Sequence, residues 1–144
     1  MSEPIHIEHD VAADDYQLAG AASNNVKETL KMLGLSSSIC RRAAIITYEA
    51  EMNLVIHGGG GRIAANIDQE SVEIMAVDRG PGIPNVELAI QEGFTTAGDR
   101  AREMGFGAGM GLPNIKRNAD IFEIDTEVGA GTTVRTVIYF QHGQ

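Results

Sequence analysis

Two polar residues one helical turn apart are the first candidates for catalysis. Glu49 and Asn53 are four positions apart in a helix-like stretch, so both side chains would leave the same helix face. A carboxylate there can take a proton from a hydroxyl group or water, and an amide oxygen can be one of the few protein ligands that Mg²⁺ takes. Glu51 points to a different face and is the poorer candidate. The same spacing also occurs in helices where a solvated Glu and an Asn have no catalytic role.

A second candidate is the carboxylate that ends an apolar strand. Asp78 follows Ile74-Met-Ala-Val and precedes Arg79-Gly-Pro-Gly. A carboxylate in this place can accept a hydrogen bond from an exocyclic amine such as N6 of adenine, while Gly80 and Gly82 let the backbone come close to a flat ring. A tight turn capped by an Asp accounts for the same residues.

A glycine-rich run before a helix-like segment is the third feature. Glycines alternate with other residues at Gly105, Gly107, Gly109 and Gly111, just before Leu112-Pro-Asn-Ile-Lys. Backbone N–H groups at the start of a helix make an anion site, although a merely flexible loop would have the same composition. The sequence contains neither a Walker motif nor a dinucleotide fingerprint. Further on, Thr132 opens the last strand, where its hydroxyl could reach a base or simply favour β structure.

Composition limits the classes to which the chain can belong. Its 144 residues carry a formal net charge of −9, which argues against nucleic acid as the main partner and suits basic protein partners. No apolar run approaches the roughly 18 residues that span a bilayer, and the first residues lack the pattern of a secretion signal. The lone Cys40 is expected to be a small buried residue. We expect a cytoplasmic protein with no membrane partner.

The remaining pattern predicts one domain, residues 1–144, that holds these groups together. Helical spacing of apolar residues predicts helices at 14–33, from 36–38 to 57, at 84–92 and at 111–119. Alternating apolar residues predict strands around 5–7 and at 62–68, 72–78, 121–127 and 132–140. Helices on one face of a mostly antiparallel, mixed sheet make a two-layer α+β sandwich.

Taken together and in this order, the motifs resemble those of the GHKL ATPases, which share the Bergerat fold. The likeness runs from about residue 43 to 137 and is tightest in Asp78-Arg-Gly-Pro-Gly-Ile-Pro, Gly107-Ala-Gly-Met-Gly-Leu-Pro and Gly129-Ala-Gly-Thr-Thr-Val. Within that family the chain is most similar to the small bacterial anti-sigma-factor serine kinases of the RsbT, RsbW and SpoIIAB type.

The resemblance implies a role for each matching residue and ATP with Mg²⁺ as cofactors. Glu49 would be the catalytic base, Asn53 the Mg²⁺ ligand and Asp78 the acceptor for the adenine amino group. Residues 93–104 would form the ATP lid, which is longer and more charged than expected, with Asp99, Arg100, Arg102 and Glu103. The remaining nucleotide-binding positions would be Gly80, Gly82, Thr95, Thr96, Gly105, Gly107, Gly109, Met110, Gly111, Leu112 and Thr132.

Three functions compete on this basis. The leading hypothesis is a serine/threonine kinase that phosphorylates a small antagonist protein with a STAS-like domain. The alternative is a nucleotide-gated binding module that sequesters a sigma factor or another partner with little or no kinase activity. A detached histidine-kinase domain would need a phosphoacceptor on a dimerisation helix, and His9 is a faint candidate. The resemblance also makes a homodimer through the first strand and helix plausible.

Overall fold

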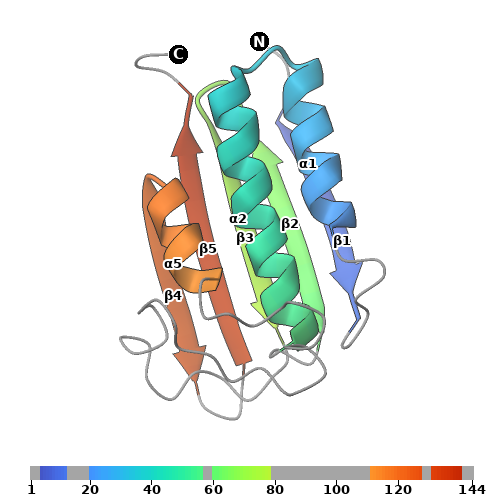
Figure 1. The fold of residues 1–144 in the computed structure, drawn as a ribbon, viewed down its shortest axis with the longest axis vertical. Helices are drawn as coiled ribbons and strands as arrows, with labels where there is room; N and C mark the ends of the chain where they lie inside the picture. The colour runs from blue at the N-terminus through green and yellow to red at the C-terminus, as the bar shows by residue number, and fades with distance from the viewer. Residues whose placement is uncertain (1–3, 13–19, 57–59, 79–110, 128–130, 141–144) are drawn as a thin grey trace.

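The computed structural model describes residues 4–12, 20–56, 60–78, 111–127 and 131–140 (Figure 1). Within these ranges, five strands form one sheet and three helices cover one of its faces. This arrangement confirms the predicted two-layer α+β sandwich. The predicted helix at 84–92, the lid at 93–104 and the glycines from 80 to 109 lie outside the described residues.

The sheet is antiparallel at every pairing between the described strands, so it is more uniform than the mixed sheet that the sequence suggests. The order is β1–β2–β3–β5–β4. The strands are β1 (Ile5–Val11), β2 (Gly61–Ile67), β3 (Ser71–Asp78), β4 (Ile121–Glu127) and β5 (Gly131–Tyr139). β2 and β3 form the predicted hairpin, and the carboxylate of Asp68 accepts the backbone N–H groups of Glu70 and Ser71 in its turn, at 2.8 and 2.9 Å.

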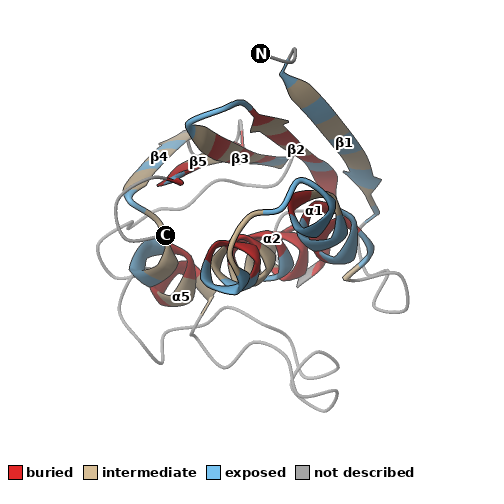
Figure 2. Cartoon of the chain, turned by 90° about the horizontal axis from the view of Figure 1, so that it is seen from above, coloured by how far each residue is buried: buried red, intermediate tan, exposed pale blue. Residues whose placement is uncertain are grey.

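The three helices lie on the same side of the sheet, with α2 between the other two (Figure 1). They are α1 (Ala21–Met32), α2 (Ser37–Ile56) and α5 (Gly111–Asn118). Figure 2 shows the buried faces of the helices turned towards the sheet. Alternate residues of β2 and β3 pack against the helices. Ile63 and Ile74 of these strands and Ile46 of α2 are buried in the same core. Because successive strand residues point to opposite faces, the other residues of these strands are left on the open face.

The turn between α1 and α2 follows the signals in the sequence. Gly34 ends α1, and its N–H donates to the carbonyl oxygen of Lys31 at 3.0 Å. Ser36 caps α2, because its hydroxyl oxygen accepts the N–H of Ile39 at 3.2 Å. Cys40, in the first turn of α2, is 3% exposed, as expected of a small buried residue.

The start of α1 differs from the prediction, and a buried carboxylate explains the difference. The helix begins at Ala21, not near residue 14, and Gly20 before it has a φ of +102°. The carboxylate of Glu51 on α2, which is only 3% exposed, accepts N–H groups of Gly20, Ala22 and Ser23 at 3.2, 3.0 and 2.9 Å. Glu51 therefore caps α1 from the neighbouring helix, a task for which helices usually use a local side chain.

Replacing Glu51 by Gln is expected to lower the free energy of unfolding by about 2 kcal/mol, because charge-assisted hydrogen bonds from a helix start are lost in a buried place. Chemical denaturation followed by circular dichroism measures the change. The matched control is Glu28→Gln on the exposed face of α1, which should change the value by about 0.5 kcal/mol or less. Equal effects of the two variants would show that Glu51 is not a significant cap.

Two further findings bear on the competing functions. His9 lies on strand β1, and one of its ring nitrogens is 2.9 Å from the side-chain amide of Asn25. It is therefore not on a dimerisation helix, as a histidine-kinase phosphoacceptor would be. None of the helices in the described ranges has the length and apolar character needed to cross a membrane.

Candidate functional site

Five chain segments converge at one end of the sandwich. α2 ends there at Ile56, β2 and α5 begin there at Gly61 and Gly111, β3 ends there at Asp78, and β5 begins there at Gly131 (Figure 1). The strand pairing requires part of this, because Gly61 is the partner of Asp78 and Val77 is the partner of Thr133. The fold thus brings together residues as far apart in the sequence as Ile56 and Gly131.

Glu49 lies on α2 facing α5 and is half-buried. Its Oε2 accepts a hydrogen bond from Nδ2 of Asn114, on α5, at 3.1 Å. Burial raises the pKa of the Glu49 carboxyl above its usual value, and the bond from Asn114 acts in the opposite direction by favouring the charged form. A carboxylate with a raised pKa is a stronger proton acceptor once it is ionised, which suits a general base.

Asn53 lies one helical turn after Glu49, and its side-chain amide sits against the first residue of α5. A Cβ atom on Gly111 would lie 2.8 Å from Oδ1 of Asn53, so a larger residue there would displace the amide. The amide oxygen of Asn53 is therefore held at the start of a helix, where backbone N–H groups attract anions. An oxygen donor beside an anion site is the donor set that suits Mg²⁺ with a phosphate.

Asp78 is tied to the start of β5. Its Oδ1 accepts the backbone N–H of Thr132 at 2.9 Å. Gly131 makes this possible: its φ is +105°, and a Cβ atom there would lie 2.5 Å from the carbonyl oxygen of Asp78. The hydroxyl of Thr132, in a side chain only 5% exposed, lies 2.8 Å from that of Thr126. The carboxylate is thus held in a defined place at the start of β5.

The structure brings together the described members of the predicted site. Glu49, Asn53 and Gly111 form one cluster, and Asp78 with Thr132 forms another at the same end of the sheet. Leu112 is buried in the core, so only its backbone can border a ligand. The other predicted positions lie outside the described residues: Gly80, Gly82, Thr95, Thr96, Gly105, Gly107, Gly109 and Met110.

Asn114 is the site residue that sequence reasoning missed. It lies three positions after Gly111 on α5, yet 65 positions from Glu49 in the chain. Its side chain is neither basic nor acidic, and an Asn inside a short helix is usually a local hydrogen-bonding residue, so its residue type gave no reason to select it. Its place on the helix that follows the glycine run was the only available signal. Arg117 donates to its Oδ1 at 2.9 Å, which orients the amide so that Nδ2 faces Glu49.

The family match defines the class of this protein: the family of histidine kinase-, DNA gyrase B-, and HSP90-like ATPases matches residues 40–142. The match covers more than half of the chain, so the chain belongs to this family. The resemblance inferred from its motifs is confirmed, and the family implies that it uses ATP.

Several individual proteins are similar to this chain. The serine/threonine-protein kinase RsbT of Bacillus subtilis is 30% identical over 121 residues, which are 81% of this chain and 85% of that protein. An anti-sigma F factor of Clostridium beijerinckii is 37% identical over 92 residues, 60% of this chain and 61% of that one. A chain in the crystal structure of the SiaB–SiaC complex from Pseudomonas aeruginosa superposes with a TM-score of 0.59. It is 15% identical and covers 92% of this chain and 88% of its own length, so it supports the fold alone.

Removing the Asn114 amide should shift the pH dependence of any reaction that uses Glu49 as a base. In an Asn114→Ala variant the bond that favours the charged carboxylate is lost, so the pKa of Glu49 rises further. The base is active when deprotonated, so the acid limb of the pH–rate profile should move to higher pH, with the rate recovering above it. Asn24→Ala, on the exposed part of α1, is the control. An unchanged acid limb would contradict the link between the two residues.

Proposed function

We propose that this protein is a Mg²⁺-dependent serine/threonine protein kinase that transfers the γ-phosphate of ATP to a hydroxyl group of a small antagonist protein with a STAS-like domain. The observation that carries the proposal is the half-buried carboxylate of Glu49, which accepts a hydrogen bond from Asn114. One turn further along α2, the amide oxygen of Asn53 lies against Gly111, at the start of α5. The names of the relatives, a serine/threonine-protein kinase and anti-sigma F factors, support it.

Each described residue has a part in this proposal. ATP would supply the phosphoryl group, and a bound Mg²⁺ would offset the negative charge on its phosphates. Asn53 would hold the cation through Oδ1, the N–H groups at the start of α5 would lie against phosphate, and Asp78 would accept the adenine amino group. Glu49 would take the proton of the acceptor hydroxyl as its oxygen forms the new bond to phosphorus, while the bond to the bridging oxygen of ATP breaks and ADP leaves.

The test is incubation of the purified protein with Mg²⁺ and γ-labelled ATP in a lysate of its own cell, followed by acid treatment. A labelled, acid-stable protein band that depends on added protein is expected, because phosphoserine and phosphothreonine survive acid. Mass spectrometry then identifies the acceptor, for which we predict a STAS-like domain. Only acid-labile label, or none although ATP binds, would contradict the kinase.

The second candidate is a nucleotide-gated module that sequesters a sigma factor. It is favoured by the anti-sigma F factors among the relatives, because their name describes action against a sigma factor. Binding to each sigma factor of the cell, measured with ATP, with ADP and without nucleotide, separates this candidate from the kinase. Tight binding that requires ATP, with no labelled acceptor, would make it the main function.

The predicted homodimer and the cytosolic location complete the proposal. β1 is one of the two edge strands of the described sheet. The exposed Met32 and Leu33 at the end of the neighbouring α1 add apolar surface, which suits pairing through these elements. Sedimentation equilibrium should give twice the monomer mass at micromolar concentration. The reaction with ATP points to the cytosol, where the nucleotide is abundant.

A further inference from the structure

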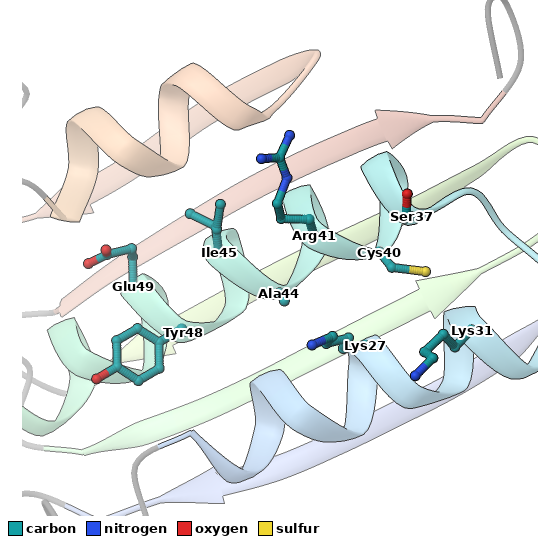
Figure 3. A pocket seen from close by; sticks show the side chains of 9 residues that line it. All are labelled: Lys27, Lys31, Ser37, Cys40, Arg41, Ala44, Ile45, Tyr48 and Glu49. Carbon is teal, nitrogen blue, oxygen red and sulfur yellow. The ribbon is translucent and has the colours of Figure 1, made fainter.

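A groove runs between α1 and α2 on the side of the helices that faces away from the sheet (Figure 3). Its volume is about 540 Å³, which is within the range of ligand-binding pockets, roughly 300–1,000 Å³. Two lysines of α1 form one side and α2 forms the rest. The lining residues are Lys27, Lys31, Ser37, Cys40, Arg41, Ala44, Ile45, Tyr48 and Glu49.

The charges around this groove are opposite to those of the chain as a whole. The net charge is −9, yet Lys27, Lys31 and Arg41 are exposed along the groove. In the described part of the chain, no ion pair involves Lys27 or Arg41, and Lys31 reaches only Glu28, at 4.0 Å between exposed atoms. An exposed pair of this kind is weak. The groove lining therefore carries the cations Lys27, Lys31 and Arg41 against the carboxylate of Glu49 at one end, so its net charge is positive.

The middle of the groove is apolar. Ala44 and Ile45 are half-buried, and Tyr48 is 38% exposed. Such residues accept an apolar side chain, and an aromatic ring beside cations is typical of protein interfaces. Basic residues flanking an apolar strip match an amphipathic segment whose polar residues are acidic.

The lining of the groove also includes the proposed base, Glu49. Glu49 lies at one end of this lining, and Arg41, Ile45 and Glu49 follow one another at intervals of four along the edge of α2 that is turned away from α1 (Figure 3). A segment lying in the groove is thus directed towards the proposed base. Neither the start of α5 nor Asp78 lines the groove, so a nucleotide at those residues would leave it open.

We propose that this groove docks an acidic, amphipathic segment of the phosphoacceptor protein and so brings its hydroxyl group to Glu49. Delivery of the hydroxyl group to Glu49 rests on the proposed function. Binding of an acidic segment rests only on the residues that line the groove. Carboxylates of the segment lie beside Lys27, Lys31 and Arg41, and its apolar side chains lie on Ala44, Ile45 and Tyr48. Overall negative charge disfavours a nucleic acid in the same place.

The first experiment tests the groove without any acceptor protein. The full chain, labelled with ¹⁵N, is titrated with a helical peptide built from Glu and Leu, and with the same peptide carrying Gln for every Glu. Saturable amide shifts at residues 27, 31 and 40–48 are expected with the acidic peptide and should weaken with salt. No saturation up to millimolar peptide, equal binding of the Gln peptide, stronger binding of a single-stranded oligonucleotide, or shifts elsewhere would overturn the proposal.

Charge reversal gives matched variants. Lys27→Glu and Arg41→Glu should each weaken the acidic peptide about threefold, and the double variant about tenfold, as expected for exposed charge pairs. Lys116→Glu, an exposed lysine on α5 outside the groove, should change the affinity less than about twofold. Equal weakening by all three single variants would show that only net charge matters, and would overturn the specific groove.

The second experiment separates failure of the groove from failure of the kinase. Labelling of the acceptor in lysate is compared for wild type, the Lys27→Glu/Arg41→Glu variant and Lys116→Glu, with ATP affinity measured for each. Loss of label in the double variant alone, at unchanged ATP affinity, supports docking. Full labelling by the double variant overturns docking and leaves the kinase intact. No label with wild type contradicts the kinase, and the peptide titration then decides on the groove.

Discussion

The Glu49→Gln variant should transfer phosphate about 100 to 10,000 times more slowly than wild type, which is the range for loss of a general base. Gln keeps the length of the side chain and can still offer an oxygen to Nδ2 of Asn114, so the contact between α2 and α5 is retained. What is lost is the ability to take a proton. The rate is measured in a single turnover with the acceptor in excess, and ATP affinity is measured separately by calorimetry.

The control for this experiment is Glu28→Gln, which removes an exposed carboxylate from α1 and should leave the rate unchanged. Unaltered transfer by the Glu49→Gln variant would remove Glu49 from the mechanism. A joint loss of transfer and ATP binding would instead assign Glu49 to the nucleotide site. These outcomes differ because a base acts on the acceptor hydroxyl and not on the bound nucleotide.

The second large effect is expected at Asp78. An Asp78→Asn variant should bind ATP about 10 to 100 times more weakly, since a hydrogen bond to a charged partner contributes roughly 1.5–3 kcal/mol. Asn can keep the oxygen that accepts the N–H of Thr132. Its amide group, however, donates where the carboxylate accepts, so it opposes the adenine amino group. Calorimetric titration with ATP and with GTP measures the change, and discrimination between the two bases should fall.

Asp125→Asn provides the comparison for that prediction. Asp125 is an exposed carboxylate on β4, opposite Thr133, so its replacement should leave nucleotide affinity unchanged. Thermal unfolding of both variants shows whether either loses the fold. Wild-type ATP affinity in the Asp78→Asn variant would contradict the role of Asp78 in base recognition.

Local patterns were enough to predict much of this molecule. Helical spacing placed Glu49 and Asn53 on one face of α2, and the apolar run before Asp78 placed that carboxylate at the end of β3. Both are consequences of short-range periodicity, which the chain carries residue by residue. The order of the motifs then identified the family, which the match over residues 40–142 confirms.

Contacts between segments that are distant in the sequence could not be predicted from such local patterns. The bond between Asn114 and Glu49 depends on how α5 packs against α2, and the capping of α1 by Glu51 depends on how α1 packs there. Helical spacing correctly predicted that Glu51 lies on a different face of the helix from Glu49. It did not indicate that the Glu51 carboxylate would be buried against the start of another helix. Side-chain roles that are set by tertiary packing have no local signature.

Because α2 is a single helix of 20 residues, it fixes the spacing between Arg41, in the proposed docking groove, and Glu49, the proposed base. Arg41 and Glu49 are eight residues apart on it, which at 1.5 Å per residue is about 12 Å along the axis. An α-helix does not stretch to suit a partner. An acceptor protein anchored at Arg41 must therefore carry its hydroxyl group about 12 Å from the anchoring carboxylate, and a protein with the same surface chemistry but a different spacing would be held without being modified.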